Sequence, residues 1–215
     1  MDKKPVDVVW ITGNGFGNVE AARLFNDNGR KSVLLSYDEM PLSRDTYASA
    51  AAAAAMEGTP TLLINNFFTP LEDCLIHEYD ETSLAMAFTQ FDAFSYFTKR
   101  AIPHFQNGGL IINIVPALGV IPARAQPLIS SLSSGVIGMT KAWALELSHL
   151  GFRVCAIAVG FTNEKNAQFT YPAIKQVVTP KDIYELVISL ENTKMLDGSC
   201  ILLDGGYVAG YVRDF

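Results

Sequence analysis

Short, unbroken apolar segments alternate with helix-forming segments along the whole chain, and this alternation is the strongest constraint on its fold. The apolar runs lack the strict polar–apolar alternation of strands that have one face in water, so they are typical of strands covered on both sides. Parallel strands need long crossovers, which are usually helices. The sequence therefore predicts an α/β fold, in which a doubly wound parallel sheet carries helices on both faces.

The expected elements follow from the apolar runs and from the segments between them. The pattern predicts six main strands, at residues 6–12, 32–37, 61–65, 110–115, 154–159 and 199–203. Helices are predicted at residues 19–27, 44–56, 82–105, 127–149 and 181–190. Thr179 followed by Pro180 favours a helix start, because a hydroxyl caps the first turn and proline fits into it.

Composition narrows the class of protein further. With 215 residues and 49% hydrophobic content, the chain is expected to form a single domain spanning residues 1–215. A net charge of -6 argues against a nucleic-acid partner. No apolar run has the length of a membrane span, and no signal peptide is recognised, so we expect no membrane partner. Cys74, Cys155 and Cys200 are widely spaced and suit a reduced, cytoplasmic location. Three dispersed histidines give no metal-binding pattern, so no metal ligand is predicted.

The first predicted strand runs directly into a glycine-rich turn and then a helix, an arrangement that binds the phosphates of dinucleotides. The turn contains Thr12-Gly13-Asn14-Gly15-Phe16-Gly17. Further landmarks follow at the ends of later strands. They read Asn65-Asn66-Phe67-Phe68, Val159-Gly160 and Leu203-Asp204-Gly205-Gly206, and the long segment Gly135-Val136-Ile137-Gly138-Met139-Thr140-Lys141-Ala142-Trp143 lies between them.

In these motifs, and over nearly its whole length, the chain resembles the short-chain dehydrogenase/reductase family. The family has Thr-Gly-x-x-x-Gly-x-Gly at the turn, Asn-Asn-Ala-Gly after the fourth strand and a terminal Asp-Gly-Gly. Here Val19 replaces the last glycine of the turn, and Phe67 and Phe68 replace the alanine and glycine. The resemblance implies a Rossmann-like sheet and a nicotinamide cofactor, NAD or NADP.

The catalytic positions that the resemblance implies hold other residues. The family's tyrosine falls on Ile129, its lysine on Ser133, its serine on Pro116 and its asparagine on Gln90. Reduction of a carbonyl needs an acid that protonates the forming alkoxide, and isoleucine has no proton to give. We therefore predict no catalytic residues and expect a pseudoenzyme with respect to the family's own chemistry.

The cofactor cleft is also altered, so the sequence predicts weak or absent cofactor binding. Phe67 and Phe68 would place rings beside the cofactor ribose, unless they turn inward and pack in the core. Ser36 replaces the acidic residue that would hold the ribose diol, and Asp38 follows two residues later. Only one helix is predicted between Asp38 and the strand at 61–65, where the family has helix, strand and helix. We infer that an edge strand and one helix are missing. If a cofactor binds, the expected contacts are Gly13, Asn14, Gly15, Phe16, Gly17, Ser36 and Asn65.

The helices predicted at 82–105 and 127–149 carry apolar residues on more than one face, which predicts a partner for the second face. In the family that the chain resembles, the corresponding helices of two subunits commonly pair across a two-fold axis. The sequence thus predicts a homo-oligomer, or a hetero-oligomer with an active relative, that Phe94→Glu or Leu132→Glu would shift toward monomer.

Three functions are compatible with these observations. The leading hypothesis is a non-catalytic structural or regulatory subunit. The alternatives are an NAD(P)-dependent oxidoreductase with an atypical active site, and a sensor that binds a dinucleotide or small ligand without turnover. A cofactor titration separates the first from the others, and a turnover assay separates the last two.

Overall fold

In the computed structural model of the protein, the described residues are 7–36, 44–69, 71, 73–163, 173–174 and 176–209. They form one sheet of six parallel strands in the order β2-β1-β3-β4-β5-β6. The strands are β1 (Asp7–Thr12), β2 (Ser32–Leu35), β3 (Thr59–Asn65), β4 (Gly109–Pro116), β5 (Phe152–Val159) and β6 (Cys200–Leu203). The predicted α/β fold is confirmed.

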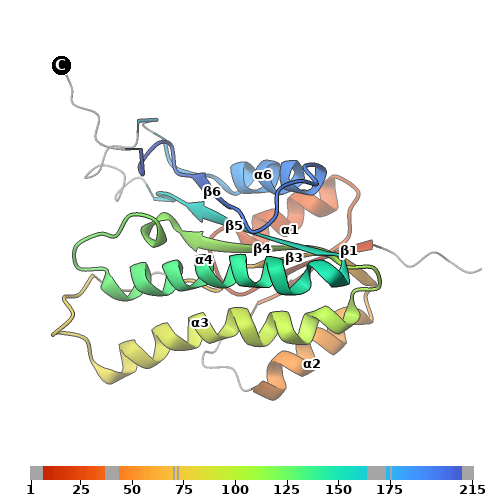
Figure 1. The fold of residues 1–215 in the computed structure, drawn as a ribbon, viewed down its shortest axis with the longest axis horizontal. Helices are drawn as coiled ribbons and strands as arrows, with labels where there is room; N and C mark the ends of the chain where they lie inside the picture. The colour runs from red at the N-terminus through yellow and green to blue at the C-terminus, as the bar shows by residue number, and fades with distance from the viewer. Residues whose placement is uncertain are drawn as a thin grey trace, which may run out of the picture.

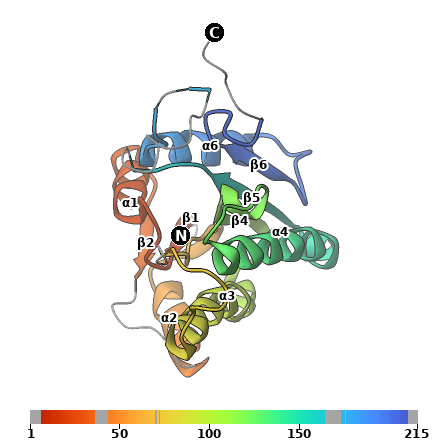
Figure 2. The same ribbon diagram turned by 90° about the vertical axis from the view of Figure 1, so that its left-hand side faces the viewer.

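Helices cover both faces of the sheet, so the fold has three layers (Figure 1, Figure 2). One face is covered by α1 (Asn18–Asp27) and α6 (Pro180–Asn192), the other by α2 (Arg44–Ala55), α3 (Glu81–Ala101) and α4 (Pro127–Leu147). In Figure 1 the strands run from right to left, so Figure 2 looks onto their carboxyl ends. In the described part of the chain, no helix combines the length and the apolar character needed to cross a membrane.

The sheet order confirms the prediction that the second strand forms an edge beside the first. β2 pairs with β1, and no described strand pairs on its other side. Between β2 and β3 the described residues form one helix, α2. Tyr37 and Asp38 lie outside the described residues. The described part of the chain thus has the reduced edge that the short spacing predicts.

Prolines explain two boundaries that differ from the prediction. β3 begins at Thr59 rather than residue 61, and Pro60 lies in it where its register with β1 shifts between Val8 and Val9. Proline has no backbone N–H to donate to the neighbouring strand, and the shift in register accommodates this missing hydrogen bond. The helix predicted to end at residue 105 ends at Ala101, and Pro103 lies in the following 3₁₀ turn, Ile102–His104.

The two faces of the sheet bury different kinds of side chain. The core under α1 and α6 is mainly aliphatic. The core under α2, α3 and α4 is rich in aromatic rings, and Trp10, Phe67, Phe94 and Phe97 are fully buried there. On this side α2 packs against α3, where the rings of Tyr47 and Tyr96 stack 6.2 Å apart. Part of the second apolar face of α3 is therefore covered within the subunit by α2.

A series of hydrogen-bonded, buried polar side chains crosses the sheet near the carboxyl ends of its strands. The Thr12 hydroxyl on β1 donates to Asn65 Oδ1 on β3 at 3.1 Å. Asn65 Nδ2 donates to Asn113 Oδ1 on β4 at 2.9 Å, and Asn113 Nδ2 donates to the Thr140 hydroxyl on α4 at 2.9 Å. These four residues are almost completely inaccessible to solvent. We call this series the polar ladder; it fixes three strands and α4 relative to one another.

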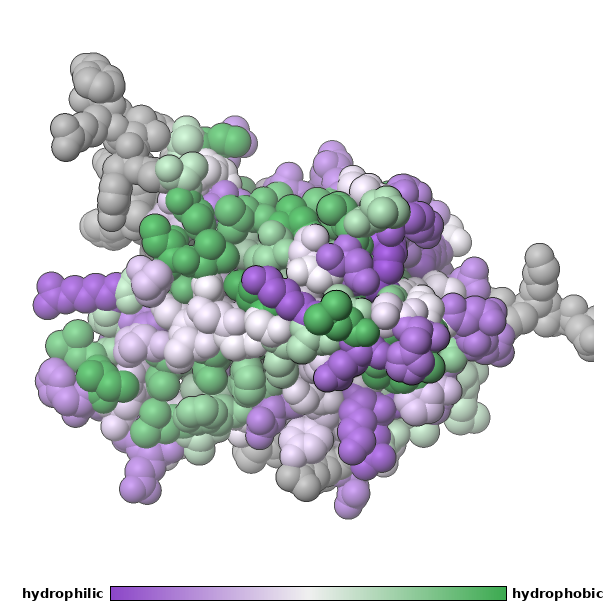
Figure 3. Space-filling model, in the orientation of Figure 1, coloured by the Kyte–Doolittle hydropathy of each residue, from purple (hydrophilic) through white to green (hydrophobic). Residues whose placement is uncertain are grey.

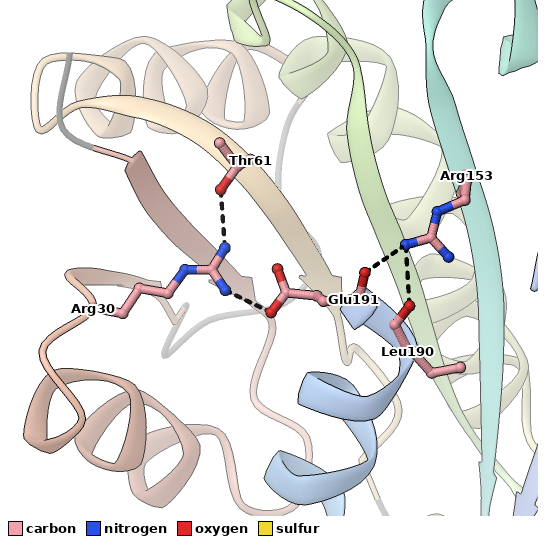
Figure 4. A network of polar contacts seen from close by, with 5 residues as sticks. All are labelled: Arg30, Thr61, Arg153, Leu190 and Glu191. Carbon is pink, nitrogen blue, oxygen red and sulfur yellow. Dashed lines mark hydrogen bonds and ion pairs between the residues drawn. The ribbon is translucent and has the colours of Figure 1, made fainter. Parts of the chain in front are cut away.

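A second polar network ties elements together at the opposite end of the sheet (Figure 4). Arg30, after α1, forms a 2.5 Å ion pair with Glu191 of α6 and donates to the Thr61 hydroxyl of β3. Arg153 of β5 donates to the backbone carbonyls of Leu190 and Glu191. Because these carbonyls belong to the last turn of α6, a cation there stabilises the helix end.

We predict that Asn113→Ala lowers the free energy of unfolding by about 2–4 kcal/mol, because it leaves Asn65 Nδ2 and the Thr140 hydroxyl without one buried partner each. Urea denaturation measures this change. The control Ser49→Ala removes an exposed helix hydroxyl and should change stability by less than about 0.5 kcal/mol. Equal effects of the two substitutions would contradict a structural role for the ladder.

Candidate functional site

A cavity of about 570 Å³ opens at the carboxyl ends of the strands, where ligands bind in open parallel sheets. Its floor comes from the ends of β4 and β5 and from the first turn of α4. Its walls come from the glycine-rich turn, the loop after β3 and the segments that follow β5 and β6. The lining residues include Phe16, Asn66, Phe68, Asp73, Pro116, Arg124, Gln126, Ile129, Phe161 and Tyr207.

The structure brings two of the four catalytic-position residues to this cavity. Pro116, the last residue of β4, and Ile129 of α4 both line it. Ser133, one turn further along α4, is fully buried and does not line the cavity. It packs against Gly119, where an added Cβ would lie 2.7 Å from Ser133 Cβ. The side chains at the positions of the acid and its lysine are thus a hydrocarbon and an uncharged hydroxyl.

The side-chain amide of Gln90 has a structural role, because both its oxygen and its nitrogen form hydrogen bonds with Thr69. Its Oε1 accepts from the Thr69 backbone N–H at 3.1 Å, and its Nε2 donates to the Thr69 hydroxyl at 2.8 Å. Both contacts hold the loop after β3, which forms one wall of the cavity. Gln90 itself is buried and lines no part of the cavity.

Two amide side chains hold the glycine-rich turn in shape. Asn66 Nδ2 donates to the Phe16 carbonyl at 3.0 Å and to Asn18 Oδ1 at 2.8 Å. Asn18 Nδ2 donates in turn to the Gly13 carbonyl at 2.8 Å. An added Cβ on Gly15 would lie 1.9 Å from Asn66 Oδ1, so the amide occupies the space beneath the turn. Sequence reasoning missed the role of Asn18, for which an asparagine at the start of a helix was the only signal.

The predicted cofactor contacts do not all meet at the cavity. Phe16 lines it, whereas the described lining contains neither the glycines of the turn nor Asn14. Ser36 is exposed just beyond the end of β2. Asn65 is fully buried, and its amide belongs to the polar ladder. The cavity therefore extends over the inner part of the cleft and does not reach Ser36.

The two phenylalanines of the Asn-Asn-Phe-Phe segment take opposite directions. Phe67 is fully buried, with its ring centroid 5.2 Å from that of Phe94, so for this residue inward packing holds and the hypothesis that it obstructs the cleft is wrong. The aromatic core under α3 takes up this ring, because burial there removes it from water. Phe68 lines the cavity and also packs on Phe94, at 5.2 Å. Only one of the two rings narrows the cleft.

The rim of the cavity holds polar residues that sequence reasoning did not select. Arg124 is exposed at the rim, and Gln126 Nε2 donates to the Asp73 carboxylate. Tyr207, three residues after Asp204, packs edge to face on Phe161 with centroids 5.0 Å apart. Arg124 and Gln126 share the loop before α4, whereas Asp73, Phe161 and Tyr207 come from other loops, and no shared motif marks these residues in the sequence.

Tyrosines with a shifted pKa lie elsewhere and are shifted in the wrong direction for acid catalysis. Burial, with a contribution from Asp92, raises the pKa of Tyr47 to about 12. Desolvation also raises the pKa of Tyr79. Neither lines the cavity, and Tyr207 is the one phenol among its described lining residues. No group of metal-ligating side chains occurs within the described ranges.

Comparison with known proteins identifies the class to which this fold and cleft belong. A family model described as enoyl-(acyl carrier protein) reductase matches residues 42–208. The chain belongs to the short-chain dehydrogenase/reductase family, as its motifs predict.

Individual relatives agree with this assignment. The chain is 26% identical over 165 residues to 3-oxoacyl-(acyl-carrier-protein) reductase FabG of Thermotoga maritima, covering 70% of this chain and 67% of that protein. It is 24% identical to carbonyl reductase family member 4 of Danio rerio, covering 93% and 96% of the two chains. The fold matches a crystal structure of a short-chain dehydrogenase/reductase from Brucella melitensis with a TM-score of 0.82 and 19% identity, covering 96% and 97% of the two chains.

Substitution of Gly13 tests the packing of the turn. Gly13 has φ +89, and an added Cβ would lie 2.3 Å from the Asn66 carbonyl oxygen. Gly29 has a similar φ of +77 with nothing within 4 Å, so it is a matched control. We predict that Gly29→Ala costs about 1–2 kcal/mol through backbone strain, and that Gly13→Ala costs at least about 2 kcal/mol more. Chemical denaturation of both variants checks this; equal losses would mean that the turn has room for a side chain.

Proposed function

We propose that this protein is a non-catalytic member of its family, which acts as a structural or regulatory subunit rather than as a reductase. The observation that carries the proposal is the pair Ile129 and Ser133. Ile129 lines the cavity as a hydrocarbon where the family's tyrosine donates a proton, and the fully buried Ser133 supplies no cation to lower the pKa of an acid. Pro116, at the position of the family's serine, has no hydroxyl to orient a carbonyl.

The residues on the side of the cleft where the family binds its cofactor also support the proposal that this protein is not a reductase. A nicotinamide cofactor, when bound, supplies the hydride of the family's reaction. The described residues could seat its inner part against Phe16, Phe68 and Gly160. The ribose diol would meet Ser36, which cannot act as the acidic acceptor, and β2 forms the edge of the described sheet. These residues fit the whole dinucleotide poorly.

We predict that the pure protein reduces acetoacetyl-coenzyme A, a 3-oxoacyl thioester, at no detectable rate with NADPH or NADH. The double variant Ile129→Tyr/Ser133→Lys should stay inactive, because the added lysine must enter a fully buried position against Gly119. A spectrophotometric assay of cofactor oxidation, with a mock purification as the control for host reductases, measures this. Turnover by the unmodified protein above that control would refute the proposal.

Pairing through α3 and α4 is the mode of action that we propose. The outward side of α4 carries small residues, and a Cβ added at Gly138 would meet no atom within 4 Å. Figure 3 views this face, on which pale and green residues extend over the left-hand and central parts of α4 and α3, while purple residues gather toward the right. Phe88 is 53% exposed and Leu145 is 82% exposed. Small residues allow close helix approach, and exposed apolar side chains favour burial against a second subunit.

Two substitutions that the sequence suggested for this interface are unsuitable. Phe94 and Leu132 belong to the core of the subunit itself, with 0% and 6% exposure. Both face the sheet side of their helices, and periodicity alone does not distinguish that side from an interface. A charge at either position would unfold the subunit rather than separate two subunits.

Exposed positions on the same helices give a valid test of assembly. We expect the unmodified protein to form a dimer or tetramer at micromolar concentration, and Phe88→Glu or Leu145→Glu to shift it toward monomer, because a buried charge opposes association. Met56→Glu, at an 89% exposed position beyond α2, is the matched control. Light scattering coupled to size exclusion measures the mass. A monomeric unmodified protein that recovers no homologue on co-purification would exclude this mode of action.

A sensor that binds a small ligand without turnover is the second candidate. The cavity of about 570 Å³ favours it, since small-molecule sites usually have volumes in this range. The remaining alternative, an oxidoreductase with an atypical site, would need a proton donor such as Tyr207, and it predicts turnover in the assay above.

A further inference from the structure

We propose that the cavity binds a compact apolar molecule with one carboxylate, and that Arg124 at its rim recognises the carboxylate. This inference rests on the proposed function, in which the cleft does not carry out hydride transfer. It also names the class of ligand that a sensor role would require.

The floor of the cavity favours an apolar body for the ligand. It is formed by hydrocarbon side chains from β4, the 3₁₀ turn after β4 and α4, namely Ile114, Val115, Pro116, Leu118 and Ile129. Phe68, Phe161 and Tyr207 add aromatic rings to the walls. Burying apolar ligand surface here contributes roughly 25 cal/mol per Å² before the costs of association.

Most polar side chains of the lining are already committed to protein partners. Both N–H groups of Asn66 Nδ2 are donated within the glycine-rich turn. Thr69 is held by Gln90 through its backbone N–H and its hydroxyl. The Asp73 carboxylate accepts from Gln126. These groups brace the walls and leave little hydrogen-bonding capacity for a highly polar ligand.

Arg124 is the one cationic residue among the described lining residues. Among the described residues it forms no ion pair, and Asp73, the one carboxylate of the lining, does not approach it within 4.0 Å. A guanidinium group has five N–H donors in a planar fork that matches a carboxylate. Its positive charge stands next to an apolar cavity, and an amphipathic acid would satisfy both.

The backbone around Arg124 is held in an unusual conformation. Ala125 has φ 62, the one positive value for a non-glycine residue in the described part of the chain. The Cys74 N–H donates to the Ala125 carbonyl at 2.7 Å, and the Ser130 hydroxyl donates to the Gln126 carbonyl at 2.7 Å. Strain of this kind persists where surrounding contacts enforce it, and it is common at ligand sites. These contacts fix the base of the Arg124 side chain at the rim.

Calorimetric titration with octanoate and 1-octanol, in the absence of any nicotinamide cofactor, tests the proposal. The probes share an apolar chain, but only octanoate is charged. We expect octanoate to bind about tenfold or more tightly than 1-octanol. Arg124→Ala should abolish this preference and leave the binding of 1-octanol unchanged. Arg23→Ala removes an exposed arginine on α1 and should leave the preference intact.

Substitutions that fill the cavity provide a second, independent test of the proposal. Ile129→Trp should weaken both probes at least tenfold while circular dichroism shows an unchanged fold, and Ile129→Phe is the milder variant if the tryptophan unfolds the protein. Equal affinity for both probes, or a preference that survives Arg124→Ala, would overturn the role of Arg124. Binding of neither probe would overturn the ligand class. These results concern probe binding alone, whereas the proposed function fails only if the protein turns over a reductase substrate. The two failures are therefore distinguishable.

Discussion

The polar ladder from Thr12 through Asn65 and Asn113 to Thr140 fixes the end of the sheet from which the cavity loops leave. Each member lies in surroundings where an unpaired amide or hydroxyl would be costly, so the register of β1, β3 and β4 and the position of α4 are set together. Asn66, the next residue after the ladder on β3, then braces the glycine-rich turn. The shape of the cleft thus depends on a buried network whose members do not line the cavity.

The position of this network outside the cavity lining lets the fold persist in the non-catalytic protein that we propose. Ile129 and Ser133 lie on a helix that is anchored elsewhere, by Thr140 in the ladder and by apolar contacts with the sheet. Replacing a proton donor by a hydrocarbon therefore leaves the helix in place and makes the cavity more apolar. Pro116 ends β4 without disturbing its pairing with Val159. Function resides in the side chains at these positions rather than in the scaffold.

The sequence predicts most of the scaffold, because strand and helix periodicities and motif spacing are local signals. The edge position of β2 follows from the short interval before β3. The sequence does not predict in which direction a side chain points after a strand ends, so it leaves open whether Phe67 enters the cleft or the core. Nor does helical periodicity separate the core side of a helix from an interface, so the assignment of Phe94 and Leu132 to an interface is wrong. The rim of Arg124, Asp73 and Gln126 joins distant loops, and no local pattern reveals such contacts.

Titration of the pure protein with NADPH and with NADH by isothermal calorimetry tests the central claim most directly, namely that the fold is retained while the dinucleotide cleft is reduced to its inner part. The account predicts no saturable binding of either cofactor up to millimolar concentration, because Ser36 and the reduced sheet edge offer little to the ribose and adenine. Saturable binding with a micromolar Kd for either cofactor would contradict it.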